Sequence, residues 1–370
     1  MKICMDIQPA VAQRAGVGRY VRELAAHLGA GAGEDRLRLF CFDFRGAARL
    51  PEASGATVRA VRWFPGRLAQ AAWRTIGWPP FDLFAGEADL YHFTNFIAPP
   101  LARGRCVVTI HDMSFARFPE FAEERNLHHL KGGIAATAAR ADAIITISRS
   151  TADEVHELLG VERSRLFPIH LGVSTDFSPQ PAEAVARIRK RYGLDGPYLL
   201  SVGTVEPRKN IPLLLDVFEQ LVDFNGKLVL VGGLGWKCEP ILARIRQSPK
   251  ADRICRIGFV QDGDLPALYT GAELFLLSSF YEGFGFPPLE AMACGTPVLS
   301  AIGGSLAEVL GEGARLLRGH EPDAWLDAAS ELLSDSAMRE DLVRRGRNWV
   351  RQYTWQRTAE QTWQVYRSLA

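Results

Sequence analysis

Short apolar segments alternate with segments of helical periodicity along the whole chain, and no internal repeat beyond this rhythm is present. In the first half, strands are predicted at residues 2–7, 37–42, 89–93, 106–110 and 143–147, and helices at 20–28 and 126–139. In the second half, strands are predicted at 198–202, 228–231, 274–277 and 298–301, with another ending at Gly258, and helices at 212–224, 264–270 and 287–294. This alternation predicts parallel βαβ units in two successive doubly wound sheets, an α/β fold.

The length of 370 residues exceeds a usual single core and predicts two domains. Residues 176–181, Asp-Phe-Ser-Pro-Gln-Pro, interrupt regular structure, so the boundary is predicted near residue 178. The last segment has apolar residues at helical spacing. We therefore predict domains at 1–178 and 179–353 and a helix at 354–370. Ligands of open α/β sheets bind beyond the carboxyl ends of the strands, so the site is expected in a cleft between the domains.

Charge and cysteine content exclude several classes of function. The net charge is +1 with interspersed signs, which gives no reason to expect nucleic-acid binding. The six cysteines form no CxxC pair and no zinc-type spacing, and they are interpreted as free thiols of a cytosolic protein. The first residues have a strand pattern, unlike a secretion signal, and no run approaches the ~18 apolar residues of a membrane span.

One aromatic segment leaves three interpretations open. Between Trp63 and Trp78, tryptophans and a phenylalanine are mixed with arginines, as in segments that lie at a membrane interface. Core packing or acceptor binding explains the same composition. A peripheral contact with the inner face of the membrane is therefore one hypothesis among the three.

The most informative motif holds two glutamates eight positions apart, Glu282 and Glu290. A loop with Gly283 and Gly285 lies between them and leads into the helix predicted at 287–294. Glycine lets backbone approach a ligand closely, and the N–H groups of a first helical turn bind anions. Each carboxylate can accept hydrogen bonds from sugar hydroxyls. The pattern indicates a site for a sugar nucleotide.

A second loop carries two adjacent cations. Gly203 and Thr204 follow a predicted strand, and Arg208 and Lys209 come just before the next helix. Departure of a nucleotide leaves negative charge on its diphosphate, and these cations can stabilise that charge in the transition state.

Two further elements belong to the first half of the chain. Gly16 and Gly18 follow the first strand and open a helix, but Val21 occupies a position where a dinucleotide fingerprint requires glycine or alanine. Nicotinamide and flavin cofactors are therefore disfavoured. His111 lies at the carboxyl end of a predicted strand, where side chains face a ligand.

The segment from Tyr281 to Val298 closely resembles the glutamate-x7-glutamate signature of retaining glycosyltransferases of family 4, and the resemblance extends over nearly the whole chain. It implies the GT-B architecture of two facing Rossmann-like domains, with the acceptor on the N-terminal side and the donor on the C-terminal side. In this family the last helix crosses back to the first domain. The chain departs from many members by placing its two cations side by side, with Thr204 where an arginine is common.

The resemblance also implies roles for individual residues. Glu290 is expected to bind the ribose, Glu282 to hold hydroxyls of the transferred sugar, Arg208 and Lys209 to neutralise the leaving diphosphate, and His111 to approach the sugar and the acceptor. The reaction is expected to proceed by front-face attack without a protein nucleophile, a metal or another cofactor. The expected donor-binding residues are Gly16, Gly18, Gly203, Thr204, Arg208, Lys209, Phe259, Val260, Glu282, Gly283, Phe284, Gly285, Phe286 and Glu290.

The substrates are expectations from the same resemblance. Similarity to O-antigen and exopolysaccharide mannosyltransferases makes GDP-mannose the first choice of donor, ahead of GDP-rhamnose or a UDP-sugar. The acceptor is expected to be a glycan or a lipid-linked glycan in surface polysaccharide biosynthesis. A sugar-nucleotide epimerase and a catalytically silent sugar-nucleotide-binding partner stay open as alternatives, and the sequence does not indicate an oligomeric state.

Overall fold

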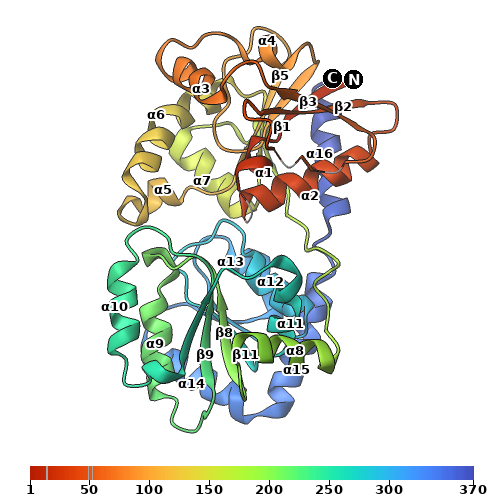
Figure 1. Cartoon of the computed structure of the whole chain (residues 1–370). Coiled ribbons are helices and arrows are strands. Elements are labelled where there is room, and N and C mark those ends of the chain that lie inside the picture. The colour runs from red at the N-terminus through yellow and green to blue at the C-terminus, as the bar shows by residue number, and fades with distance from the viewer. Residues whose placement is uncertain (14–15, 49, 52) are drawn as a thin grey trace. The chain divides into compact units, whose positions relative to one another are not determined.

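The computed structural model describes residues 1–13, 16–48, 50–51 and 53–370 and divides into two compact units (Figure 1). Unit 1 contains Met1–Gly172 and Tyr353–Ala370, and unit 2 contains Val173–Gln352. The first unit thus ends before the predicted boundary at residue 178. The reason is that Phe177 is buried against unit 2, where its ring lies 6.0 Å from that of Tyr269.

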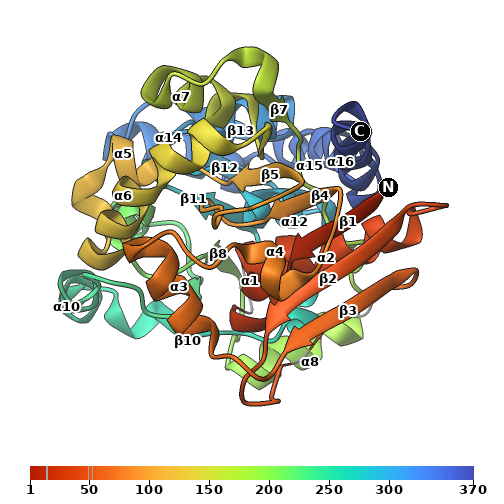
Figure 2. The same cartoon turned by 90° about the horizontal axis from the view of Figure 1, so that it is seen from above.

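Unit 1 is built on a parallel sheet of seven strands in the order β3-β2-β1-β4-β5-β6-β7. Figure 2 shows β3 at the outer edge of this sheet. The strands are β1 (Lys2–Asp6), β2 (Arg36–Phe42), β3 (Ala56–Val61), β4 (Leu90–Phe93), β5 (Arg105–Ile110), β6 (Ala143–Thr146) and β7 (Leu166–Pro168). The helices are α1 (Gln8–Ala12), α2 (Val17–Ala30), α3 (Gly66–Thr75), α4 (Phe81–Ala85), α5 (Ser114–Arg117), α6 (Glu124–Arg140), α7 (Arg149–Leu159) and α16 (Trp355–Ser368), with short 3-10 turns at Pro119–Phe121 and Arg163–Arg165.

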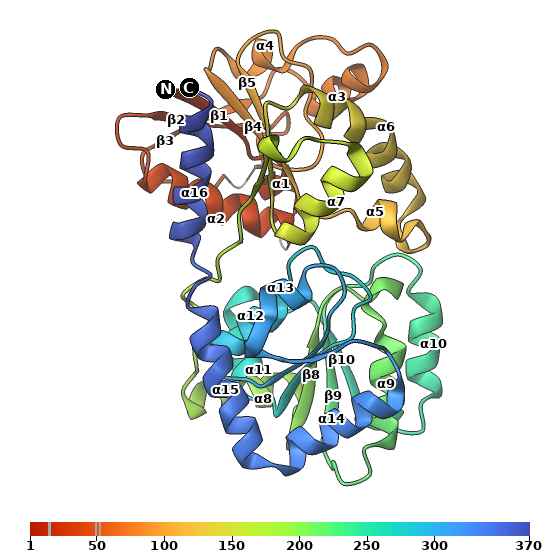
Figure 3. The same cartoon turned by 180° about the vertical axis from the view of Figure 1, so that it is seen from behind.

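Unit 2 is built on a parallel sheet of six strands in the order β10-β9-β8-β11-β12-β13. The strands are β8 (Tyr198–Val202), β9 (Lys227–Val231), β10 (Ile254–Gly258), β11 (Leu274–Leu277), β12 (Val298–Ala301) and β13 (Arg315–Leu317). The helices are α8 (Ala182–Tyr192), α9 (Ile211–Gln220), α10 (Glu239–Gln247), α11 (Leu265–Thr270), α12 (Phe286–Ala293), α13 (Leu306–Leu310), α14 (Pro322–Ser334) and α15 (Ser336–Val350). The 3-10 turns are η3 (Pro207–Lys209), η4 (Ala251–Arg253), η5 (Asp262–Asp264) and η6 (Gly311–Gly313). Helix α14 packs against α9, and α12 packs against α15 (Figure 3).

The two predicted parallel sheets are confirmed, and the central strands have the predicted composition. β6, β11 and β12 are buried at every residue, as expected for strands covered by helices on both faces. Three strands were not predicted. β3 lies at the sheet edge and is mostly exposed, so it lacks a continuous apolar run, and β7 and β13 have only three residues each.

Helix α16 packs against α2 in unit 1 and completes its core. The Trp363 indole N–H donates to the backbone carbonyl of Leu28 at 3.2 Å. Tyr366 is fully buried, and its hydroxyl lies 2.6 Å from Nδ1 of His92 on β4. The last helix of the chain is therefore held in the first unit by apolar packing and by buried polar contacts.

A chain of buried hydrogen bonds continues from His92 across unit 1. Its Nε2 lies 2.8 Å from Oγ1 of Thr109 on β5, and this hydroxyl lies 2.9 Å from the hydroxyl of Tyr20 on α2. Burial, with a smaller contribution from the nearby His111, lowers the pKa of His92 to about 3. His92 is thus a neutral imidazole that links α16, β4, β5 and α2.

No helix in the described part of the chain is long and apolar enough to cross a membrane. The six cysteines are free thiols, and Cys255 is the one that is only partly buried.

We expect Tyr366→Phe to lower the stability of unit 1 by about 1–3 kcal/mol, because the change leaves a buried nitrogen of His92 without its partner. Thermal unfolding measured by calorimetry, with hydrogen exchange of α16 and β4, checks this expectation. Tyr192→Phe is the matched control, since its hydroxyl bonds Asp264 at a half-buried position of unit 2 and its loss should cost less. Equal stability of Tyr366→Phe and the wild type would contradict the role of the buried network.

Candidate active site

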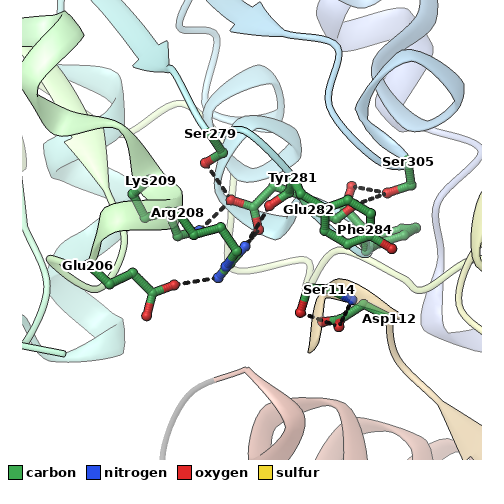
Figure 4. A network of polar contacts seen from close by, with 10 residues as sticks. All are labelled: Asp112, Ser114, Glu206, Arg208, Lys209, Ser279, Tyr281, Glu282, Phe284 and Ser305. Atoms are coloured by element: carbon green, nitrogen blue, oxygen red, sulfur yellow. Dashed lines mark hydrogen bonds and ion pairs between the residues drawn. The ribbon is translucent and has the colours of Figure 1, made fainter. Parts of the chain in front are cut away.

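Two loops meet at the carboxyl ends of β8 and β11, which are neighbours in the sheet of unit 2. From β8 the chain adds β9 and β10 on one side of the sheet, and from β11 it adds β12 and β13 on the other side. The direction in which strands are added therefore reverses between β8 and β11. Ligands of doubly wound sheets bind at such a switch point. Figure 4 shows the side chains of both loops converging there.

Glu282 forms the centre of this cluster. It is 9% exposed, and its Oε1 accepts hydrogen bonds from Lys209 Nζ and, at 2.6 Å, from the Ser279 hydroxyl. Its Oε2 accepts a hydrogen bond from Arg208 at 2.9 Å. Burial by itself would raise the pKa of this carboxyl, but the charges of Lys209 and Arg208 outweigh burial and hold it at about 2.

Arg208 joins Glu282 to a second carboxylate, Glu206. One guanidinium nitrogen donates to Glu282 and, at 2.6 Å, to the backbone carbonyl of Tyr281, and the other donates to Glu206 at 2.6 Å. Glu206 is 2% exposed. The cluster thus has two carboxylates and two cations, so its formal charges balance. Sequence reasoning missed Glu206, although its place just before the Pro-Arg-Lys sequence was a usable signal.

Backbone contacts fix the two loops to each other. The Ser278 hydroxyl is 2.9 Å from the carbonyl oxygens of both Lys209 and Asn210. The backbone N–H of Phe280 donates to the carbonyl of Arg208 at 2.9 Å. The cations and Glu282 are therefore positioned by hydrogen bonds between segments about seventy residues apart in sequence.

A third loop, after β12, supports Glu282 from its backbone side. A side chain on Gly303 would place its Cβ 2.0 Å from the carbonyl oxygen of Phe280, and one on Gly304 would lie 2.3 Å from that of Glu282. Gly304 also has a positive φ of 66°. Ser305 donates to the Glu282 carbonyl from its backbone N–H at 2.9 Å and its hydroxyl at 3.0 Å. Sequence analysis missed this loop, although Gly-Gly-Ser after a buried strand is a recognisable turn.

Glu290 lies on α12, away from the ion pairs of Glu282. It is buried, and its Oε2 accepts a hydrogen bond from the Tyr269 hydroxyl at 2.8 Å. Gly285 precedes the helix with a φ of 106°, which favours glycine, and Pro287 lies in the first turn. The predicted helix is confirmed within one residue at each end. Tyr269 was not predicted, because nothing in the sequence relates it to Glu290.

The remaining donor residues of unit 2 lie in neighbouring loops. Gly203 is close to Lys209, since a Cβ there would lie 3.1 Å from the lysine Cε, and Thr204 is exposed. Gly283 is partly buried, and the buried ring of Phe284 lies 5.4 Å from that of Phe286. Phe259 is exposed and Val260 is buried after β10, which β9 separates from β8. Their binding roles stay predictions.

His111 follows β5 in unit 1 and is nearly fully buried. Its Nε2 lies 2.8 Å from the backbone carbonyl of Thr94, which only accepts, so Nε2 carries the proton. The Tyr20 ring meets the imidazole edge-on at 5.1 Å. Burial lowers the pKa of His111, against the opposing effects of the Thr94 carbonyl and Asp112. The side chain is thus a fixed, neutral imidazole.

Other polar residues at the carboxyl edge of unit 1 have defined roles. Asp112 lies before α5 and accepts hydrogen bonds from the backbone N–H and the hydroxyl of Ser114, the first residue of that helix, at 2.9 and 2.7 Å (Figure 4). Asp6 ends β1, and its backbone carbonyl accepts a hydrogen bond from the Thr94 hydroxyl at 2.8 Å. Burial raises the pKa of the Asp6 carboxyl to about 6, although the Gln8 N–H lowers it. Sequence analysis treated Asp6 only as a strand residue.

Gly16 precedes α2 and Gly18 lies in its first turn, and both serve local geometry. Gly16 has a φ of 57°, and a Cβ on Gly18 would lie 2.0 Å from the carbonyl oxygen of Gln13. Both positions therefore demand glycine for the turn into the helix. Contact with a donor stays a prediction.

Within the described ranges, no group of three or more His, Cys, Asp or Glu side chains is arranged to hold a metal ion. Metal independence was expected on the ground that no Asp-x-Asp motif marks a metal site, but the sequence does contain this pattern at 262–264. Its Asp264 accepts hydrogen bonds from Arg191 at 2.9 Å and from the Tyr192 hydroxyl at 2.7 Å.

Comparison with known proteins agrees with this geometry. Residues 14–177 match the model of glycosyltransferase family 4, and residues 185–349 match that of glycosyl transferases group 1. Over 391 aligned residues, the chain is 30% identical to O-antigen chain mannosyltransferase B of Escherichia coli, with both proteins covered completely.

Two solved structures share the fold. Sucrose-phosphate synthase of Thermosynechococcus elongatus aligns with a TM-score of 0.78 at 22% identity, covering 100% of this chain and 98% of that one. HepE of Anabaena, solved in complex with UDP-glucose, aligns with a TM-score of 0.75 at 18% identity over all of both chains. The architecture is GT-B, and the chain belongs to glycosyltransferase family 4.

Proposed function

We propose that the protein is a retaining, metal-independent hexosyltransferase that moves mannose from GDP-mannose to a glycan or lipid-linked glycan. The observation that carries the proposal is the cluster of Arg208, Lys209 and Glu282 at the switch point of unit 2. It combines positive charge for a diphosphate with a carboxylate for sugar hydroxyls. Family membership supports the transfer reaction over the epimerase alternative.

The cations act on the leaving group in this proposal. Breaking the bond between sugar and phosphate leaves negative charge on the diphosphate, and Arg208 and Lys209 supply fixed positive charge for it. In other transferases, a divalent cation neutralises this charge on the diphosphate. Both cations contact Glu282, so the diphosphate shares or replaces these contacts when it binds.

The carboxylates act on the sugar nucleotide. Glu282 stays ionised at physiological pH, so it accepts hydrogen bonds from hydroxyls of the transferred hexose. Glu290, oriented by the hydroxyl of Tyr269, is proposed to bind the ribose. His111, a neutral imidazole with a fixed ring, is proposed to position the sugar and the acceptor. No residue needs to form a covalent bond, because the leaving phosphate is proposed to accept the acceptor proton.

Two relatives favour different donors. The name of the Escherichia coli relative specifies mannose, whereas the Anabaena structure contains UDP-glucose. The higher sequence identity, over the whole chain, is to the mannosyltransferase, so GDP-mannose is the first donor to test.

We expect GDP-mannose and GDP to bind more tightly than UDP-glucose, UDP or free mannose in isothermal titration calorimetry. Lys209→Ala should weaken GDP binding by roughly 10- to 100-fold, because one charge-assisted hydrogen bond is worth about 1.5–3 kcal/mol. Lys190→Ala, an exposed lysine on α8, is the control and should bind like the wild type. A preference for UDP would overturn the choice of mannose. Binding without turnover on any tested acceptor would favour the silent partner.

We expect Glu282→Gln to bind GDP several-fold more tightly than the wild type while transfer falls by roughly 100-fold or more. The change removes one of two negative charges that face two cations, so the site gains net positive charge for the diphosphate but loses its sugar contact. Calorimetry and a radiolabelled transfer assay measure the two effects. Glu239→Gln, an exposed glutamate on α10, is the control. Weaker GDP binding by Glu282→Gln would contradict the assigned role.

We expect transfer to continue in excess chelator and the product to keep the α-configuration of the donor. A transfer assay with and without EDTA tests the first expectation, and NMR of the new glycosidic linkage tests the second. Complete loss of transfer in chelator, restored by added Mg²⁺, would refute metal independence. A β-linked product would refute retention.

A further inference from the structure

Unit 1 exposes an unusual set of large apolar side chains around α3 and α4. Five of them, between 58% and 70% exposed, come from four consecutive stretches of the chain: Trp63, Leu68, Ile76, Trp78 and Leu83. Soluble surfaces rarely gather so many, and such a patch marks a binding surface. We call these five side chains the apolar patch.

The stretches that carry the patch pack on one another. The Trp63 ring lies 5.6 Å from that of Phe84 on α4, next to Leu83. The Trp73 ring on α3 lies 5.9 Å from that of Phe81, and its indole N–H donates to the carbonyl of Pro79 at 2.6 Å. Trp73 is thus partly buried and packs against the core. Of the three tryptophans singled out in the sequence, Trp63 and Trp78 are the exposed ones.

Positive charge predominates in the segment that carries the patch. Residues 53–81 contain four arginines and no aspartate, glutamate or lysine, and Asp82, next to Leu83, accepts a hydrogen bond from the backbone N–H of Ala102 at 2.9 Å. Arg62 pairs with Asp43, and Arg59 donates to a backbone carbonyl of α4. Arg67 and Arg74, both exposed, form no hydrogen bond or ion pair with any described residue.

We propose that this surface docks on a membrane containing anionic lipids, with the apolar patch at the level of the headgroups and acyl chains and Arg67 and Arg74 on lipid phosphates. Tryptophan is enriched at such interfaces, where its apolar ring and its N–H are both accommodated. Unpaired arginines favour a negative surface. The inference deepens the proposed function, because a lipid-linked acceptor would lie at that membrane.

Flotation with vesicles tests the docking surface on the full chain, without donor or acceptor. The wild type should float with vesicles of phosphatidylglycerol and phosphatidylcholine, and less with phosphatidylcholine alone. Trp63→Ser/Trp78→Ser should abolish flotation. Arg67→Gln/Arg74→Gln should lower partitioning by roughly 20-fold at low salt, since each arginine near an anionic surface contributes about fivefold. In high salt, the difference in vesicle partitioning between the wild type and Arg67→Gln/Arg74→Gln should become smaller.

The control is Arg246→Gln/Arg256→Gln, which removes two exposed and unpaired arginines from unit 2 and should float like the wild type. Absence of wild-type flotation, or equal loss in this control, would overturn the proposal. So would a dimer in light scattering that Trp63→Ser/Trp78→Ser dissociates while neither protein binds vesicles. Failure of the docking proposal is distinguished from failure of the proposed function by measuring GDP binding of Trp63→Ser/Trp78→Ser and Arg67→Gln/Arg74→Gln. Both variants should bind GDP like the wild type, because the cluster proposed to bind the nucleotide lies in unit 2.

Discussion

The pairing of the buried Glu282 with Arg208 and Lys209 is the constraint around which unit 2 is organised. A carboxylate removed from water is costly unless opposite charges and hydrogen bonds compensate it. Three loops, after β8, β11 and β12, provide the compensation. The glycines at 303 and 304 let the last loop approach the backbone of Glu282. The loops at the carboxyl edge of the sheet are thus arranged so that the charge of Glu282 is compensated.

Balanced charge gives the cluster two properties that oppose each other. Ion pairs with Glu206 and Glu282 hold Arg208 and Lys209 in place. The same carboxylates reduce the attraction for a diphosphate. A donor that also offers sugar hydroxyls gives Glu282 new hydrogen bonds when the cations turn to phosphate. In the proposed function, the complete sugar nucleotide is therefore favoured over phosphate alone.

The sequence predicts much of the fold and part of the site. Continuous apolar runs separated by helical patterns predicted two parallel sheets. Glu282 was found by its spacing to Glu290 around a glycine loop, and Arg208 and Lys209 were found as adjacent cations in a loop after a predicted strand. Tyr269 was missed, since its hydrogen bond to Glu290 joins two separate helices and has no local signature, whereas Glu206 was missed although it lies two residues before its partner Arg208. Trp73 was grouped with Trp63 and Trp78 because composition does not distinguish a partly buried indole that packs against the core from an exposed one. Edge strand β3 lacked the apolar run on which strand prediction rests.

The two units present different chemistry at the carboxyl edges of their sheets. The edge of unit 2 has two carboxylates paired with two cations, whereas that of unit 1 has the carboxyl groups of Asp6 and Asp112, which accept hydrogen bonds from nearby residues, and His111, a neutral imidazole fixed by the Thr94 carbonyl and the Tyr20 ring. Tyr20 is itself held through Thr109 and His92 to Tyr366 of the last helix. A nucleotide diphosphate requires charge compensation, but an uncharged glycan hydroxyl requires only oriented hydrogen-bonding groups. In the proposed function, unit 2 binds the donor and unit 1 orients the acceptor, and α16 contributes to the acceptor side by holding Tyr20 through this hydrogen-bond chain.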